Sequence, residues 1–267
     1  MKTQKTKVHF IEKYLLQPAN PITVNLVGAG GTGSHVLTAL AKVHTSLLAL
    51  QHPGLFVRVF DEDIITAANR GRQLFADAEI GLSKAVVLIN RINRFFGTDW
   101  KAFTMEFNKA NSKYLQDYKA HITISCVDKV QPRFEIAAIL KQQHKSNAYY
   151  RDNACYWMDF GNSRHMGQVV LATVGKIEQP ASKKFTPVDS LPIPTEEFKD
   201  LFEAAKEDNA PSCSLAEALT KQDLFINASL ADLGGSLLWQ LLSEGMIENR
   251  GFFLNLRNFK TEPLKVA

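Results

Sequence analysis

Residues 24–37 have the sequence VNLVGAGGTGSHVL, in which an apolar run breaks into clustered glycines and then resumes at helical spacing. The first run, residues 22–27, has the length and the branched side chains of a buried strand. After the glycines, apolar residues recur on one face of a helix: Val36, Leu37, Leu40 and Val43. Glycines permit close approach of a ligand to the backbone, and a helix N-terminus offers unpaired N–H groups with a partial positive charge. The stretch therefore predicts a strand, an anion-binding turn and a helix, and the glycines of the turn are Gly28, Gly30, Gly31 and Gly33.

A second apolar strand supports the interpretation that the anion is a nucleotide. Residues 55–60 end at Asp61, the place where sheets of this kind put an acid that binds the ribose. The separation from Gly33 is slightly longer than usual, because the predicted helix runs from Ser34 to about Leu50. A glycine turn alone is a weak signal. The alternative, a turn with a purely structural role, stays open at this point.

The composition is that of a globular protein without a membrane span. Of the 267 residues, 45% are hydrophobic and 22% are charged, and the uncharged apolar stretches are too short to cross a bilayer. The N-terminal residues contain lysines but lack the apolar core of a signal peptide, so we expect a cytoplasmic protein. The net charge of +4 is spread along the chain, so we expect neither nucleic acid nor a membrane as a partner.

The three cysteines, Cys126, Cys155 and Cys213, contain no Cys-x-x-Cys pair. An odd number of thiols without that spacing predicts neither a disulfide framework nor a cysteine-only zinc site. We therefore expect a reducing compartment and no structural zinc.

Strand and helix patterns alternate through the first 160 residues. Strands are expected near residues 22–27, 55–60, 99–106, 121–126 and 154–160, and helices near 34–50, 82–95, 111–117 and 130–144. This alternation predicts an α/β fold with a doubly wound, mostly parallel, Rossmann-like sheet. A helix near 222–243 and a strand pair at 252–256 and 262–266 would add a C-terminal antiparallel β and helix elaboration.

We divide the chain into four segments. Residues 1–20 are an N-terminal arm with a short helix around His9 to Leu16, and residues 21–175 are the nucleotide-binding domain. Residues 176–212 are rich in proline and predict a long crossover or lid, because a loop of this length in a compact domain is usually functional or disordered. Residues 213–267 complete the same domain.

A dense polar run follows the second strand, beside the expected nucleotide. Its members include Asp61, Asp63, Asn69, Arg70, Arg72 and Gln73. Phosphoryl and nucleotidyl transfer require cations that hold phosphate oxygens, and arginine does this with two directed donors. Lys84 at the start of the next helix adds a positive charge, and Asp128 after the strand near 121–126 is a candidate magnesium ligand.

Taken together, these residues resemble the motif of the ThiF/MoeB/HesA family, whose relatives include the ubiquitin-activating enzymes. The family's pattern is a GxGGxG turn, an acidic strand end, N-x-x-R-Q, a lysine, and an aspartate after a small-residue strand. This chain is similar to that pattern over about residues 20–130. The roles that the resemblance implies are ribose binding by Asp61, phosphate binding by Asn69, Arg72 and Lys84, a magnesium site at Asp128, and further nucleotide contacts by Asp63 and Gln73.

A looser match lies at residues 211–218, PSCSLAEA, which is similar to the family's cysteine-containing segment. By this resemblance Cys213 is a candidate acceptor of the activated substrate, with a structural role as the alternative. The chain is also similar to the short ThiF-like proteins of the bacterial PRTRC system, which are encoded beside ubiquitin-like small proteins. A homodimer is a further expectation from the family.

The resemblance implies an adenylyltransferase that binds ATP and magnesium, joins AMP to the C-terminal carboxylate of a small ubiquitin-like protein, and releases pyrophosphate. Arg72, Lys84 and Asp128 would carry the catalysis, with Cys213 as the candidate thiol. Two alternatives stay open. The glycine turn and Asp61 also suit an NAD-dependent oxidoreductase, although hydride transfer has no use for the cations of this run. A non-catalytic adaptor would keep the fold only to bind a ubiquitin-like protein.

Overall fold

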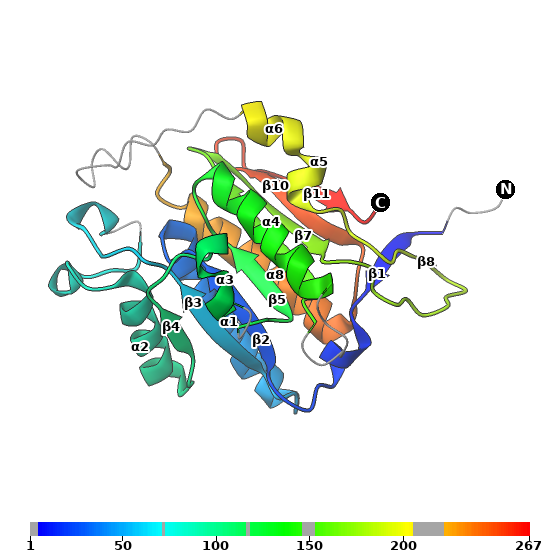
Figure 1. Ribbon diagram of the computed structural model, residues 1–267. Helices are drawn as coiled ribbons and strands as arrows, with labels where there is room; N and C mark the ends of the chain where they lie inside the picture. Colours follow the sequence, from blue (N-terminus) through cyan, green and yellow to red (C-terminus); the bar gives the residue numbers. More distant parts are fainter. Residues whose placement is uncertain (1–4, 71–72, 116–117, 146–152, 205–221) are drawn as a thin grey trace.

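A computed structural model of the chain describes residues 5–70, 73–115, 118–145, 153–204 and 222–267. Within these residues, an eight-stranded sheet forms the centre of the molecule (Figure 1). In spatial order its strands are β11 (Lys260–Lys265), β10 (Asn249–Asn255), β7 (Met166–Thr173), β6 (Tyr156–Asn162), β5 (Ile122–Ser125), β2 (Ile22–Val27), β3 (Leu55–Phe60) and β4 (Lys101–Phe103). The strands from β6 to β4 are parallel, and β7, β10 and β11 are antiparallel to their neighbours. The predicted mostly parallel α/β fold with an antiparallel C-terminal part is confirmed.

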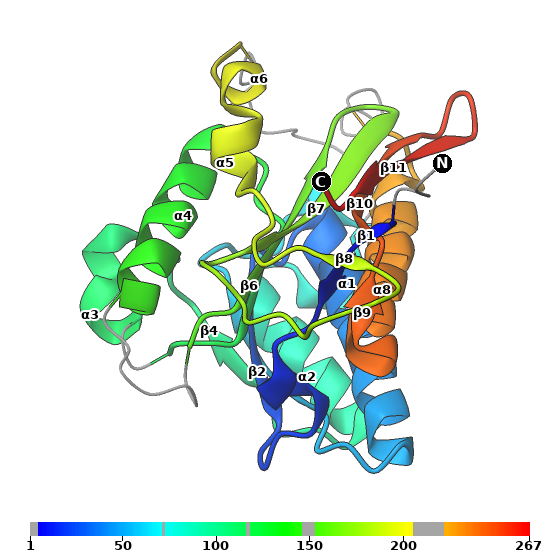
Figure 2. The same ribbon diagram turned by 90° about the vertical axis from the view of Figure 1, so that its right-hand side faces the viewer.

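Helices cover both faces of this sheet (Figure 2). One face carries α1 (Gly31–Ala49), α2 (Lys84–Phe96) and α8 (Ile226–Glu244), and α1 packs against both of the others. The other face carries α3 (Ser112–Leu115), α4 (Val130–Lys145) and α5 (Pro194–Glu197), and α6 (Lys199–Ala204) follows α5. Short 3-10 helices are η1 (Lys13–Leu16), η2 (Ala67–Asn69), η3 (Asp77–Glu79) and η4 (Lys109–Asn111). Two helical layers explain the mostly apolar central strands, since both faces of the sheet are covered.

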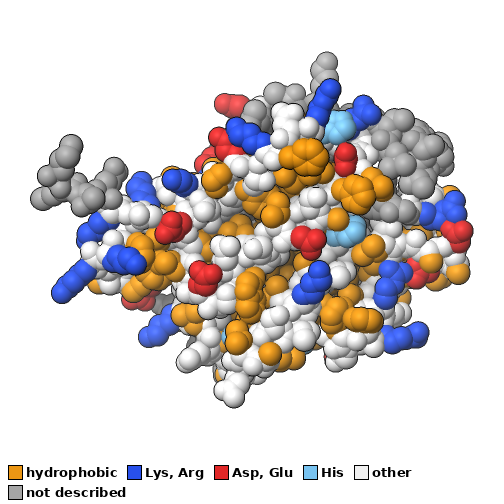
Figure 3. All heavy atoms as spheres, turned by 180° about the vertical axis from the view of Figure 1, so that it is seen from behind, with side chains coloured by type: hydrophobic (Ala, Val, Ile, Leu, Met, Phe, Trp, Pro, Cys, Tyr) orange, Lys and Arg blue, Asp and Glu red, His pale blue; other side chains and the backbone are white. Residues whose placement is uncertain are grey.

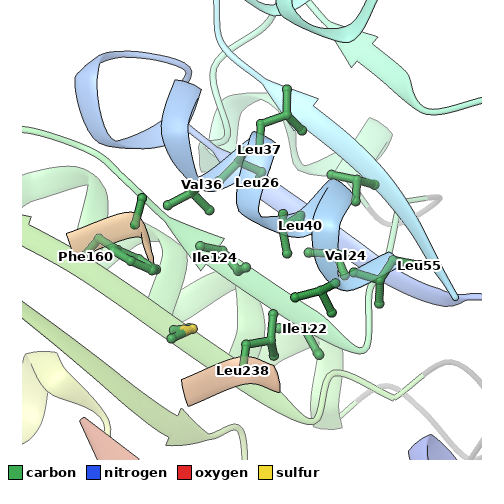
Figure 4. Packing of buried hydrophobic residues seen from close by; sticks show 14 of the residues in the cluster. Val24, Leu26, Val36, Leu37, Leu40, Leu55, Ile122, Ile124, Phe160 and Leu238 are labelled. Carbon is green, nitrogen blue, oxygen red and sulfur yellow. The ribbon is translucent and has the colours of Figure 1, made fainter. Parts of the chain in front are cut away.

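The larger of two hydrophobic clusters in the described residues lies between the sheet and the helices α1, α2 and α8. Val24 and Leu26 of β2 pack against the helix face formed by Val36, Leu37 and Leu40, all of them buried (Figure 4). Neighbouring strands and α8 continue this cluster through Leu55, Ile122, Ile124, Phe160 and Leu238. Burial of apolar area of this kind is the main stabilising term in folding. This packing keeps the carboxyl ends of the strands, and with them the glycine turn, in place.

The N-terminal segment differs from the prediction. The expected helix from His9 to Leu16 is wrong: residues 7–10 form strand β1 (Lys7–Phe10), and only η1 is helical. β1 pairs in parallel with β8 (Thr186–Pro187) and antiparallel with β9 (Met246–Ile247), in a small second sheet. The reason is tertiary, because both pairing partners lie more than a hundred residues away in the sequence.

Other elements differ from the predictions mainly in length. The strand expected at 99–106 shortens to β4, and the described part of the predicted crossover contains β8, α5 and α6. The predicted C-terminal strand pair is confirmed as β10 and β11. Among the described residues, none of the helices combines the length and the apolar character that a bilayer crossing requires. Seen from behind, basic, acidic and hydrophobic side chains are interspersed over the surface, without one block of charge (Figure 3).

Candidate functional site

The carboxyl ends of β2, β3, β5 and β6 border a cavity of about 560 Å³. Open parallel sheets bind their ligands at this edge. Most of the predicted site residues line it: Gly28, Gly30, Gly31, Asp61, Asp63, Asn69, Gln73, Lys84 and Asp128. Gly33 is buried in the first turn of α1, below the cavity wall, and Arg72 and Cys213 lie outside the described residues.

The glycine turn has the shape that an anion site requires. Gly28 has a φ of +93°, and a Cβ there would lie 2.8 Å from the carbonyl oxygen of Cys126. A Cβ on Gly33 would lie 1.9 Å from the carbonyl oxygen of Gly28, so only glycine fits both positions. At Gly30, by contrast, a Cβ would meet no atom within 4 Å and would project into open space. α1 begins at the next residue, so the unpaired N–H groups of its first turn adjoin this space.

Asp61 lies beside the turn, at the end of β3. Its Oδ2 accepts the N–H of Ala29 at 2.6 Å, and its Oδ1 accepts the N–H of Asp63 at 2.9 Å. Burial raises the pKa of the Asp61 carboxyl, while the Ala29 hydrogen bond and the charge of Lys84 act in the opposite direction. The two backbone hydrogen bonds fix the orientation of the carboxylate, and its remaining lone pairs can accept hydroxyl donors from a ligand.

Lys84 is the first residue of α2 and the buried cation of the cavity wall. Its Nζ lies 2.7 Å from Oδ2 of Asp63, with the lysine side chain 9% exposed and the aspartate side chain 63% exposed. The backbone N–H of Lys84 also donates to the carbonyl oxygen of Asp63, at 3.0 Å. A buried cation needs an anionic partner, and a phosphate oxygen can take the place of the carboxylate. Because Asp63 is exposed, it can return to solvent while Lys84 pairs with a phosphate oxygen.

Asn69 and Gln73 come from the segment between β3 and α2. Oδ1 of Asn69 accepts from the backbone N–H and the hydroxyl of Thr66, at 2.8 and 3.1 Å, and this capping holds η2 in place. Gln73 is buried, and its Oε1 has no hydrogen-bond partner among the described residues. Buried polar atoms are normally paired, so an orphaned acceptor at a cavity wall indicates a place for a ligand or a water molecule.

Asp128 is exposed at the cavity mouth, on the loop between β5 and α4. Arg133 holds this loop from below, since it donates to the carbonyl oxygens of Val127 and Lys129, at 2.7 and 2.8 Å. Arg133 also pairs with Asp159 of β6 at 3.0 Å, and both side chains are at most 5% exposed. The loop that carries Asp128 is thus anchored to the sheet by a buried ion pair.

Sequence reasoning missed several residues of this region, and four of them make side-chain hydrogen bonds there. Arg133 and Asp159 form the buried pair, and Asn162 and Asn227 line the cavity on the side of β6 and α8. A signal existed for Asp159, because it is an acidic residue within an apolar strand. No local signal existed for Asn227, whose hydrogen-bond partner Thr32 is 195 residues away.

The surroundings of the two described cysteines do not activate their thiols. Cys126 lies at the cavity wall, and burial raises the pKa of its thiol. Burial also raises the pKa of Cys155 to about 12. Thiols of this kind stay protonated near neutral pH and are poor nucleophiles.

Comparison with solved structures gives proteins of the same fold. PaaA is 14% identical with a TM-score of 0.59, over 94% of this chain and 65% of that protein. MccB from E. coli in a structure with MccA is 16% identical with a TM-score of 0.56, over 95% of this chain and 65% of MccB. MccB from E. coli in a structure with ATP is 14% identical with a TM-score of 0.55, over the same shares of both chains. The chain therefore spans about 65% of the length of these proteins.

The sequence comparisons identify a family but no individual curated relative. A search of curated proteins gives no match. The family description that fits the sequence is that of the ThiF family, and it covers residues 3–265, nearly the whole chain. With the glycine turn, the acidic strand end and the lysine of α2 on one cavity, the chain belongs to the ThiF family.

Proposed function

We propose that this protein binds ATP with magnesium and transfers AMP to the terminal carboxylate of a peptide or small protein, releasing pyrophosphate. The observation that carries the proposal is one cavity that combines the glycine turn, Asp61, Lys84 and Asp128. The MccB structures with ATP and with MccA support it, because they hold a nucleotide and a second molecule on a similar fold.

The residues of the cavity fit the parts of a nucleotide. The Asp61 carboxylate would accept the ribose hydroxyls, and the first turn of α1 would donate its N–H groups to phosphate oxygens. The space above Gly30 leaves room for a phosphate group close to the backbone. Lys84 would leave Asp63 and pair with a phosphate, and Asn69, Arg72 and Gln73 would bind further polar atoms of the nucleotide.

The chemistry requires little from a catalytic base. A carboxylate oxygen of the substrate attacks the α-phosphorus, a new P–O bond forms, and the bond to the pyrophosphate oxygen breaks as pyrophosphate leaves. The attacking carboxylate is already ionised near neutral pH, so no proton has to be removed. The enzyme accelerates the step by positioning the two reactants and by neutralising phosphate charge, which we assign to Lys84 and Arg72.

A magnesium ion, when bound, would neutralise further phosphate charge. Such ions are commonly held by one or two carboxylates together with substrate phosphates and water. Asp128 at the cavity mouth offers one carboxylate of this kind. In the described residues, no group of three or more His, Cys, Asp or Glu side chains is arranged to hold a metal ion. Asp128 is the residue of this chain that would hold the ion when the nucleotide is bound.

The finer parts of the proposal concern the substrate. We propose a small ubiquitin-like protein as the carboxylate substrate, on the motif resemblance of residues 20–130, with Cys213 as the thiol that would accept the activated protein. A homodimer belongs to the same set of proposals. Nucleotide binding does not depend on these parts, and calorimetry tests it separately.

Calorimetry with the purified chain tests the nucleotide part. Wild type is titrated with ATP and magnesium, with ATP and a chelator, and with NAD, beside the variants Asp128→Ala and Lys84→Ala. Lys141→Ala is the matched control, because Lys141 is an exposed lysine that pairs with Glu196 on α5. We expect magnesium-dependent ATP binding that Lys84→Ala and Asp128→Ala weaken and Lys141→Ala keeps. Tight binding of NAD instead would favour an oxidoreductase, and binding of neither nucleotide would favour an adaptor.

A further inference from the structure

The cavity has a second wall, formed by amide side chains on the far side of Gly31. Asn227, the second residue of α8, is only 1% exposed and lies at the centre of this wall. Its Oδ1 accepts from the hydroxyl of Thr32 at 2.8 Å and from Nδ2 of Asn162 at 2.8 Å. Its Nδ2 donates to Oε1 of Gln222 at 3.0 Å. One side chain therefore joins α1, β6 and the start of α8.

The same amide lies directly against the glycine turn. A Cβ on Gly31 would be 2.7 Å from Nδ2 of Asn227 and 2.9 Å from its Cγ, which is closer than real Cβ atoms come. A side chain at Gly31 would therefore have to displace the hydrogen-bonded amide of Asn227. Asn227 thus adjoins the first residue of α1, Gly31, and holds the second, Thr32, by a hydrogen bond.

We propose that Asn227 is a positioning residue for nucleotide binding, because its amide holds the first turn of α1 in the geometry that receives phosphate. This inference rests on the proposed nucleotide function of the turn. It goes beyond that function, because it assigns a role to a residue of α8, almost two hundred residues from the turn in the sequence.

The chemistry of the position requires an amide. Two donors point at Oδ1 and one acceptor faces Nδ2, and an asparagine satisfies all three. Aspartate would lose the donor and would put a negative charge next to the place where an anion binds. Leucine has a similar shape but would leave the hydroxyl of Thr32 and the amide of Asn162 without their partner. Binding sites depend on side chains that support the contacting groups to within about 0.5 Å.

Two variants test the positioning role of Asn227 by removing different numbers of its hydrogen bonds. Asn227→Leu removes all three hydrogen bonds, and Thr32→Val removes only the hydroxyl at nearly constant volume. Asn25→Leu is the matched control, since Asn25 is a buried asparagine of β2 whose Nδ2 donates to the carbonyl oxygen of Tyr118, outside the cavity. The measurements are the dissociation constant for ATP with magnesium, the thermal midpoint, and amide hydrogen exchange at Ser34, whose N–H donates to the carbonyl oxygen of Gly30 at 3.0 Å.

We expect Thr32→Val to raise the dissociation constant for ATP about tenfold, the effect of one lost hydrogen bond, and Asn227→Leu to raise it further. Thr32→Ser should recover most of the affinity that Thr32→Val loses. Asn25→Leu should lower the thermal midpoint while its folded fraction binds ATP as wild type does. Equal affinities of wild type and Thr32→Val, or equal losses in Asn227→Leu and Asn25→Leu, would overturn the proposal.

Hydrogen exchange separates this proposal from the proposed function. If wild type binds no ATP, the proposed function fails. Exchange at Ser34 then shows separately whether the contacts of Asn227 hold the first turn of α1. Exchange that is at least tenfold faster in Thr32→Val than in wild type would support the fixing of the turn. An unchanged exchange rate would overturn it, whatever the nucleotide result.

Discussion

At the scale of single residues, we expect alanine at Gly33 to lower stability and alanine at Gly30 to weaken ATP binding. A methyl group at Gly33 meets the carbonyl oxygen of Gly28 at 1.9 Å, whereas one at Gly30 meets nothing. Gly33→Ala should lower the free energy of unfolding by about 3 kcal/mol, because backbone atoms must move. Gly30→Ala should change it by less than about 0.5 kcal/mol but weaken ATP binding about tenfold, because the methyl group occupies the phosphate space. Urea denaturation and calorimetry measure both effects, and full ATP affinity in Gly30→Ala would contradict the placement of the phosphate.

Histidines set a pH dependence of stability. Burial is the main cause that lowers the pKa of His9, His35 and His44. A lowered pKa in the folded state means that the unfolded chain binds more protons below about pH 6.5, so this stability is complete above that pH and is lost as the pH falls. The free energy of unfolding should therefore be lower at pH 5.5 than at pH 7.5. His9→Asn keeps a donor toward the carbonyl oxygen of Val188 and should reduce the pH slope; an unchanged slope would exclude His9 as a contributor.

At the scale of elements, a tyrosine ties β1 to the main sheet. The hydroxyl of Tyr156 on β6 accepts the N–H of Glu12 at 3.0 Å and lies 2.9 Å from Nε2 of His9. Tyr156→Phe would leave the buried ring of His9 and the half-buried N–H of Glu12 without this partner, and we expect a loss of about 2 kcal/mol in the free energy of unfolding. Tyr114→Phe, at a side chain that is 48% exposed, is the control and should change it by less than about 0.5 kcal/mol. Equal stability of the two variants would show that β1 is held by other contacts.

Elements could be predicted where the decisive contacts are local or repeat along the chain. β2 and β3 have the predicted bounds, because burial makes each strand a mostly apolar run, broken in the middle by Asn25 and Arg58. β1 could not be predicted, since its pairing with β8 and β9 depends on residues far away in the sequence. The site divides in the same way. Asp61, Lys84 and Asp128 follow strands or start helices, so their order in the sequence predicts a common edge of the sheet, and they do line one cavity. Asn227 reaches that cavity only through the packing of α8 on α1.

At the scale of the whole molecule, stability and the site share one buried ion pair. Arg133 of α4 and Asp159 of β6 are in contact, and Asp159 also accepts the hydroxyl of Ser125 on β5 at 2.5 Å. Trp157 donates from Nε1 to the same serine oxygen at 2.8 Å. This network joins a helix and two strands directly below the loop of Asp128. Its loss should therefore affect folding and magnesium-dependent binding together.

Arg133→Met should lower the free energy of unfolding by about 3–5 kcal/mol, because it leaves the Asp159 carboxylate buried without its cation. The double variant Arg133→Met with Asp159→Leu should be more stable than Arg133→Met alone, since no uncompensated charge remains. The Asp128 loop would still lack its two hydrogen bonds from Arg133, so the double variant should regain stability without regaining magnesium-dependent ATP affinity. Urea denaturation gives the first quantity and calorimetry with and without a chelator the second. Recovery of both together would mean that the loop keeps its position without Arg133, and that the ion pair serves the fold alone.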